Sequence, residues 1–232
     1  MFKLESPFMN FLNKVADVMI LSVVFMLACV PVFTAGAALT AAYYMGFKMV
    51  KNEETYIIRG FFKAFKENFK QATIIWLLVL LLVAVMAVDY RIILYSGISF
   101  ASWMRIATLT VTVIVLLGIV FVFPMQARFE NTVKNTIKNA FLMALSHLPS
   151  AFLLIIVYAV PYLILYFVPQ LLPAVFLLGF GCIFYFKSFV LLRVFKKYET
   201  TPEEAIAEPD TEETIQENMD AETEPAVENH AD

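Results

Sequence analysis

Long apolar runs separated by short polar segments are the main pattern along this chain. The clearest runs carry no charge from residue 71 to 88 and from residue 106 to 127. Because a helix rises about 1.5 Å per residue, about 20 apolar residues cross a hydrocarbon core of about 30 Å. Each of these runs therefore predicts one transmembrane helix.

A third uncharged run, from residue 139 to 186, is long enough to cross a membrane twice. It contains a Pro-Gln-Leu-Leu-Pro sequence, and proline breaks a helix because it lacks the backbone N–H donor. We therefore expect one span near residues 148–168, kinked at Pro161, and another near residues 173–193. Lys187 lies close to the end of the last span, and we expect its ammonium group to extend to the lipid headgroups.

The uncharged segment from residue 18 to 47 is too long for one span and short for two. Pro31 and Gly36 lie in its middle, where we expect the helix to break. We assign residues 15–31 to a first helix and residues 34–50 to a short second helix, with the break at or inside the far membrane surface. The second helix has a small residue at every fourth position, which lets membrane helices pack closely; these are Ala38, Ala42 and Gly46.

The positions of lysine and arginine predict the side of each loop, because cytoplasmic loops carry the excess of these residues. With six spans and a cytoplasmic N-terminus, 15 basic residues are inside and only Arg91 and Arg105 are outside. If residues 18–47 form a single span, the chain has five spans, its N-terminus is outside and the split is 13 to 4. We expect six spans, with five as the alternative, in the cell membrane. Both arrangements place residues 51–70 and the C-terminus in the cytoplasm.

The composition also indicates an all-α, polytopic membrane protein. Of the 232 residues, 61% are hydrophobic and 16% charged, whereas soluble domains average about 45–50% and about 25%. Residues 1–198 carry all 17 basic residues and seven acidic ones, a net charge of +10. Residues 199–232 carry 13 acidic residues and no Lys or Arg. We expect an integral membrane domain at 1–198 and a disordered tail at 199–232, because the tail has too few apolar side chains to offset its ordering entropy.

Two predicted cytoplasmic segments, residues 51–70 and 128–147, have the periodicity of amphipathic helices. In the first segment, aromatic rings form one stripe and cations fill the neighbouring sector. Such rings enter the acyl boundary of a membrane while the cations meet anionic lipid. We expect contact with the anionic inner leaflet or with a partner protein through Arg59, Phe62, Lys63, Phe65, Lys66, Phe69 and Lys70.

No motif for catalysis, cofactor binding or metal binding occurs. The chain has no P-loop, no His-Glu-x-x-His, no Gly-x-Ser-x-Gly and no Cys-x-x-Cys sequence. Cys29 and Cys182 lie within predicted spans, where a thiol behaves as a small apolar group. We expect no enzyme activity, no cofactor, no metal and no nucleic-acid partner. No charge lies at the centre of a predicted span, which disfavours ion-coupled transport.

Two segments carry a resemblance to a known family. Residues 29–37 read Cys-Val-Pro-Val-Phe-Thr-Ala-Gly-Ala, and residues 60–72 read Gly-Phe-Phe-Lys-Ala-Phe-Lys-Glu-Asn-Phe-Lys-Gln-Ala. Both are similar to motifs of the YesL-like family of bacterial integral membrane proteins, and the resemblance covers roughly residues 8–197. The family has no assigned molecular function, and its genes often lie near those for uptake and breakdown of plant oligosaccharides.

The resemblance implies an accessory role in carbohydrate uptake, with subunits of a sugar ABC transporter as partners. It carries no catalytic residue over to this chain. Two alternatives stay open at this stage. One is a stand-alone transporter of a neutral solute, and the other is a membrane-organising protein that acts through its amphipathic helices.

Overall fold

A computed structural model of the protein describes residues 7–53, 56–95, 102–196 and 198. Nearly all of these residues are helical and none lies in a strand, which confirms the predicted all-α fold. The chain divides into two units, residues 1–194 and 195–232, and the contacts given below lie within the first. The acidic tail predicted at residues 199–232 lies outside the described residues.

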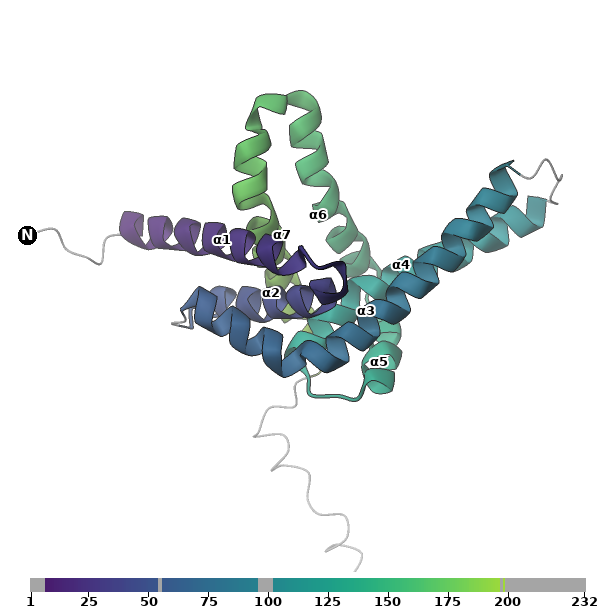
Figure 1. Cartoon of the computed structure of the whole chain (residues 1–232), viewed down its shortest axis with the longest axis horizontal. Coiled ribbons are helices and arrows are strands. Elements are labelled where there is room, and N and C mark those ends of the chain that lie inside the picture. Colours follow the sequence, from purple (N-terminus) through teal and green to yellow (C-terminus); the bar gives the residue numbers. More distant parts are fainter. Residues whose placement is uncertain (1–6, 54–55, 96–101, 197, 199–232) are drawn as a thin grey trace, which may run out of the picture. The chain divides into compact units, whose positions relative to one another are not determined.

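Seven α-helices and two short 3-10 helices follow one another among the described residues (Figure 1). In chain order they are α1 (Pro7–Cys29), η1 (Val32–Thr34), α2 (Ala35–Val50), α3 (Ile57–Tyr95), α4 (Ser102–Arg128), α5 (Val133–Ser146), α6 (Leu148–Phe167), η2 (Pro169–Leu171) and α7 (Leu172–Phe195). Of these, α1, α3, α4, α6 and α7 are long and apolar enough to cross a membrane. Several such helices make this a multi-pass membrane protein, with five candidate spans in the described part of the chain. The predicted sixth span is not confirmed.

The predicted sixth span, residues 34–50, corresponds to α2, which is only 16 residues long and is buried by other helices. It packs against α1, α3 and α4, and 11 of its residues are buried. A helix that is apolar on all sides lies either in a protein core or in lipid. In this protein the neighbouring helices supply the apolar surroundings, so α2 requires no contact with lipid.

The break between α1 and α2 lies beside the start of the apolar part of α3. The indole Nε1 of Trp76 donates a hydrogen bond of 2.7 Å to the carbonyl oxygen of Val32. Trp76 is six residues after Lys70, a helical distance of about 9 Å. The break therefore lies near the Lys70 end of the apolar run at residues 71–88, whereas the sequence predicted it at or inside the far membrane surface.

The turn after α2 has a local cause. Asn52 has a φ of 54°, in the left-handed region. Its N–H donates to the carbonyl of Met49, and the N–H of Glu53 donates to the carbonyl of Lys48. This pair of bonds is the Schellman motif, in which a left-handed residue ends a helix. The motif reverses the chain so that α3 returns along α2.

The predicted amphipathic helix at residues 51–70 is not a separate element. Residues 57–70 form the first part of α3, a continuous helix of 39 residues that also contains the following apolar run. No proline or glycine occurs between residues 61 and 95, so nothing in the sequence breaks the helix there. At about 58 Å, α3 is nearly twice as long as a hydrocarbon core is thick, and part of it must lie outside that core.

The second predicted amphipathic segment, residues 128–147, contains α5, which packs along the second half of α4. The ring of Phe141 lies against Gly118, where an added Cβ would be 2.6 Å from the ring. Gly118 lies ten residues before the end of α4, so α5 follows α4 for about 15 Å. This helix is therefore part of the helix bundle and does not lie apart from it.

Candidate functional site

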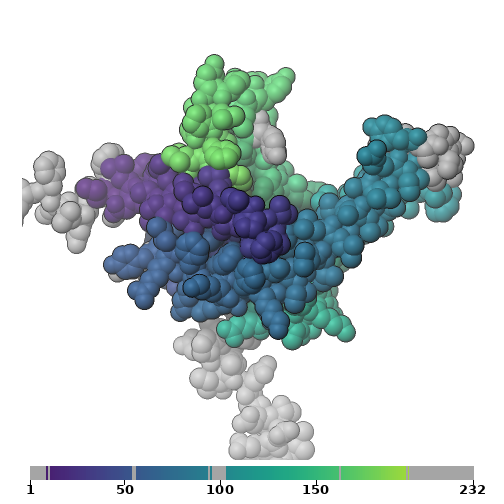
Figure 2. Space-filling view, in the orientation of Figure 1, coloured from purple at the N-terminus to yellow at the C-terminus, as the bar shows by residue number. Residues whose placement is uncertain are grey.

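The predicted contact residues on α3 form a basic-aromatic face, made of Arg59, Phe62, Lys63, Phe65, Lys66, Phe69 and Lys70. All of its cations are exposed, and Phe62 is 46% exposed. The opposite face of α3 is buried, with Phe61 and Ala64 packed inside. Figure 2 shows the α3 surface in blue, accessible below α1. The face is therefore available to lipid or to a partner.

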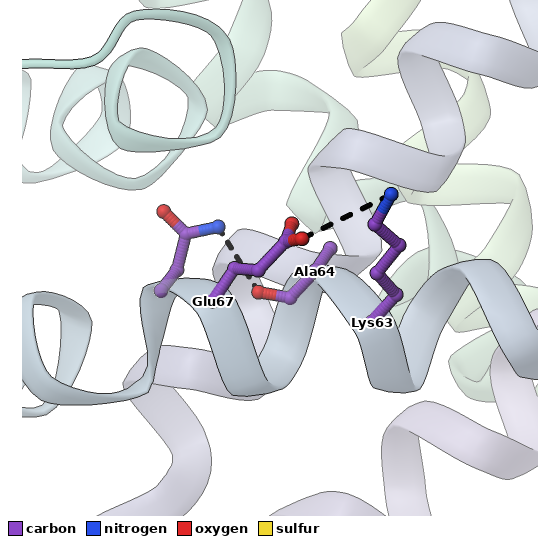
Figure 3. Close-up of polar contacts among 4 residues, drawn as sticks. Lys63, Ala64 and Glu67 are labelled. Carbon is purple, nitrogen blue, oxygen red and sulfur yellow. Dashed lines mark hydrogen bonds and ion pairs between the residues drawn. The ribbon is translucent and has the colours of Figure 1, made fainter.

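Among the described residues, few interactions engage these cations. Lys63 Nζ lies 3.9 Å from the Glu67 carboxylate one helical turn away, as Figure 3 shows. Both side chains are mostly exposed, and an ion pair of this kind contributes about 0.5 kcal/mol or less. Such a weak pair can exchange for a contact with another molecule.

The aromatic residues of the face form a continuous row along the helix. The ring centroids of Phe62 and Phe65 are 6.4 Å apart, and those of Phe65 and Phe69 are 5.5 Å apart. Phe65 and Phe69 are partly exposed, so the row borders the buried face of α3. In the structure these rings lie along one side of α3, and the buried side of the helix, with Phe61 and Ala64, is next to them.

Next to the basic-aromatic face lies an open cavity of about 940 Å³, lined by the first half of α3, the end of α4, the connection to α5, the start of α5 and one residue of α2. We call it the polar cleft. Its lining combines charged, amide, hydroxyl and aromatic side chains: Tyr44, Glu67, Asn68, Lys70, Gln71, Gln126, Arg128, Phe129, Glu130, Asn131, Thr132 and Asn135, together with Ala127.

A hydrogen-bond network centred on Gln126 holds the wall of the polar cleft. Its side-chain Nε2 donates to Gln71 Oε1 at 2.7 Å and to Asn68 Oδ1 at 3.3 Å. Its Oε1 accepts a hydrogen bond from the Thr136 hydroxyl at 3.2 Å. Gln126 is 4% exposed and Thr136 is fully buried. Three helices are thus joined by one amide whose orientation is set by its partners.

Two local features position this network. Asn68 Nδ2 donates to the carbonyl of Ala64, which leaves Asn68 Oδ1 for Gln126. At the other side, the Thr132 hydroxyl accepts from the N–H of Asn135 and caps the start of α5. Gln126 was not among the contact residues predicted from the sequence. Its sequence context does indicate such a role, because Gln126 is a carboxamide residue in an otherwise apolar helix and a buried carboxamide requires hydrogen-bond partners.

Lys187 of α7 lies in a second cluster, and its predicted extension to the headgroups is wrong. The side chain is fully buried, and among the described residues its Nζ has no hydrogen-bond partner. Nζ lies 3.5 Å from the ring centroid of Tyr158 and 5.8 Å from that of Tyr43. Because a desolvated cation–π contact contributes about 2 kcal/mol or more, the rings replace part of the lost hydration.

The predicted packing residues lie where α2 meets α3 and α7. Ala38 and Ala42 are fully buried. A Cβ at Gly36 would be 2.5 Å from the backbone of Ala72, and a Cβ at Gly46 would overlap the Ser188 hydroxyl. Two further predicted residues lie elsewhere: Pro31 is exposed at the break before η1, and Pro161 lies inside α6.

Within the described ranges, no group of three His, Cys, Asp or Glu side chains is placed to hold a metal ion. Cys29 and Cys182 are free thiols that are partly buried. The described residues therefore offer a basic-aromatic contact surface and a polar cavity.

Comparison with known proteins gives one family match. Residues 16–90, about a third of the chain, match a family described as "Protein of unknown function, DUF624". The matched segment contains α2, most of α1 and α3, and the whole basic-aromatic face. No curated protein and no solved structure matches the chain. The match is to an uncharacterised family, and it assigns no activity to these residues.

Proposed function

We propose that this protein is a non-enzymatic accessory component of carbohydrate uptake in the cell membrane. It contacts subunits of a sugar ABC transporter, or the anionic lipid around them, through the basic-aromatic face on the cytoplasmic side. The observation that supports this role is the exposure of the cations and of Phe62 on α3, while the other side of the helix is buried on α2. Exposed aromatic residues next to cations are typical of contact surfaces.

The carbohydrate part of the proposal rests on the resemblance to the YesL-like family. The match to a family of unknown function over residues 16–90 is compatible with that relationship, and it covers the segment that carries the basic-aromatic face. The same proposal puts residues 51–70 in the cytoplasm, together with the C-terminus.

Affinity purification from a mild detergent, at native expression, tests this role. We expect the full-length protein to recover permease subunits of a sugar transporter. The double variant Lys63→Gln/Lys66→Gln should recover several-fold less, because it removes two exposed cations without touching the buried face. The matched control is Arg91→Gln/Arg105→Gln, which removes two exposed cations predicted on the other side. Recovery of the protein alone, or equal loss in both variants, would contradict the proposal.

A stand-alone solute transporter is the second candidate, favoured by Lys187. Ionisable residues in membrane helices are costly and mark solute or proton paths, and Lys187 is fully buried within a candidate span. Purified protein in vesicles would then move labelled mono- and disaccharides, and Lys187→Met would abolish this flux. Flux at the level of empty vesicles would rule out this candidate for those sugars.

A further inference from the structure

Two cavities follow one another along α3 and α4, and residues of α5 contribute to the lining of both. The first is the polar cleft. The second is an apolar groove of about 350 Å³, lined by Ile75, Leu78, Val79, Leu81, Leu82, Val85, Ile119, Val122, Ile137 and Phe141. The groove begins one turn beyond Gln71 on α3 and one turn before Gln126 on α4. The two cavities are therefore neighbours along α3 and α4, with the hydrogen-bonded amides of Gln71 and Gln126 between them.

The dimensions of the groove correspond to one leaflet of a membrane. From Ile75 to Val85 the helix extends about 15 Å, which is half of a hydrocarbon core of about 30 Å. The polar cleft lies at the level of Lys70 and Arg128, the cations that flank the apolar runs of α3 and α4. Headgroups are found at this level when cations border a span. The pair of cavities is thus arranged like a lipid, with its polar end at the membrane surface.

The charges in the polar cleft are balanced. Lys70 and Arg128 are the basic residues of its lining, and Glu67 and Glu130 are the acidic ones. An anionic headgroup would meet the two carboxylates as well as the two cations. A headgroup with a phosphate and an ammonium group can satisfy both pairs, because charge-assisted hydrogen bonds form to each.

We propose that the polar cleft and the apolar groove together bind one molecule of phosphatidylethanolamine. Its phosphate interacts with Lys70 and Arg128, and its ammonium group donates hydrogen bonds to Glu67 and Glu130. One acyl chain lies in the apolar groove. Phosphatidylcholine has the same charges, but its quaternary nitrogen has no N–H to donate, so the carboxylates distinguish the two lipids.

The hydrogen-bond network of Gln126 preorganises the proposed lipid site. Gln126, Gln71 and Asn68 hold α3 and α4 at the junction of the two cavities, and their amides are fixed by one another. A preorganised wall lowers the entropic cost of binding, because few side chains need to be ordered when the lipid arrives. This proposal is independent of carbohydrate uptake, since a lipid site can exist whatever the partner protein is.

Native mass spectrometry of the full-length protein in detergent tests the proposal. The probes are phosphatidylethanolamine, phosphatidylcholine and phosphatidylglycerol with identical acyl chains. We expect one phosphatidylethanolamine to be retained at least five-fold more than either other lipid. Equal retention of the ethanolamine and choline lipids would overturn the proposal, and so would preference for phosphatidylglycerol, which would indicate attraction by the cations alone.

Three variants separate the parts of the site. Glu67→Gln/Glu130→Gln should remove the preference for phosphatidylethanolamine, so that it and phosphatidylcholine are retained about equally. The matched control Glu53→Gln/Asp89→Asn removes two exposed carboxylates elsewhere and should keep the preference. Leu82→Trp should fill the apolar groove and lower the retention of all three lipids equally. Loss of the preference in the control, or full retention in Leu82→Trp, would overturn the site.

A soluble competitor distinguishes a lipid from a free solute. Free phosphoethanolamine has the same headgroup chemistry but no acyl chain. We expect it to displace the lipid only at a concentration at least 100-fold above that of the lipid. Displacement at equal concentration would show that the apolar groove contributes nothing, and the lipid assignment would be wrong.

Discussion

A matched pair of glycines in α7 gives a sharp test of how the helices pack. Gly181 and Gly179 are two residues apart on the same helix, so replacement by alanine should bring the same gain in helix propensity, about 1 kcal/mol. Their surroundings differ. A Cβ at Gly181 would overlap the backbone carbonyl oxygen of Val18 in α1, whereas a Cβ at Gly179 would meet only Val175 of its own helix at 3.4 Å.

The clash at Gly181 cannot be relieved by rotating a side chain, because the obstructing atom belongs to the backbone. Overpacking of this kind costs about 1–3 kcal/mol. The same shift would weaken the hydrogen bond of 2.7 Å from the N–H of Gly181 to Ser22 Oγ, which contributes about 1 kcal/mol. After the gain in helix propensity, we expect Gly181→Ala to lower the free energy of unfolding by about 2 kcal/mol. Gly179→Ala should raise it by up to about 1 kcal/mol.

Thermal unfolding of the full-length protein in detergent measures both changes. For a chain of this size, a loss of about 2 kcal/mol lowers Tm by roughly 4–8 °C. The variant Ser22→Ala removes the hydroxyl near the new Cβ, and we expect it to be non-additive with Gly181→Ala, because the two sites are in contact. If Gly181→Ala were as stable as Gly179→Ala, the close approach of α1 and α7 would be refuted.

Three further predictions use the same unfolding measurement. Tyr158→Leu should lower the free energy of unfolding by about 2 kcal/mol in the native protein, because it leaves the buried ammonium group of Lys187 without its nearest ring. In a Lys187→Met background the same substitution should cost clearly less, and equal costs in the two backgrounds would contradict the contact. Gln126→Leu should cost about 1–3 kcal/mol, since it leaves its buried partners unsatisfied, and a neutral effect would exclude the network. Trp76→Phe should cost about 1 kcal/mol through its lost hydrogen bond, whereas Trp103→Phe, at a side chain 70% exposed, should be neutral; the reverse order would be incompatible with this fold.

Local features of the structure could be predicted from the sequence, because they depend on residues that are close to one another along the chain. The helical breaks at Pro31 and at the Pro-Gln-Leu-Leu-Pro sequence follow from the missing proline N–H, and both are observed. The runs predicted at 106–127, 148–168 and 173–193 became helices whose ends lie within four residues of the predicted ones, since hydrophobic length is a property of the run itself. The stripe of rings on residues 57–70 follows from helical periodicity in the same way.

Other features depended on contacts between segments far apart in the chain. Hydropathy could not decide whether α2 faces lipid or protein, because both surroundings are equally apolar to an Ala-rich helix. In the structure α2 packs against α1, α3 and α4, and with 16 residues it is too short to be one of the five candidate spans among the described residues. Lys187 similarly appeared free to extend outward, because its neighbours Tyr43 and Tyr158 are 144 and 29 residues away in the chain.

The sequence by itself determined that this is an all-helical membrane protein with a basic-aromatic face, since composition, periodicity and charge are properties of single segments. Three features were decided only by the tertiary structure. Residues 57–70 and the following apolar run form one helix, α3, and α5 packs along α4. The third feature is the polar cleft with its network centred on Gln126. The physical reason is that cavities and buried polar networks are made by several helices at once. Their energies depend on distances that no single segment of the chain contains.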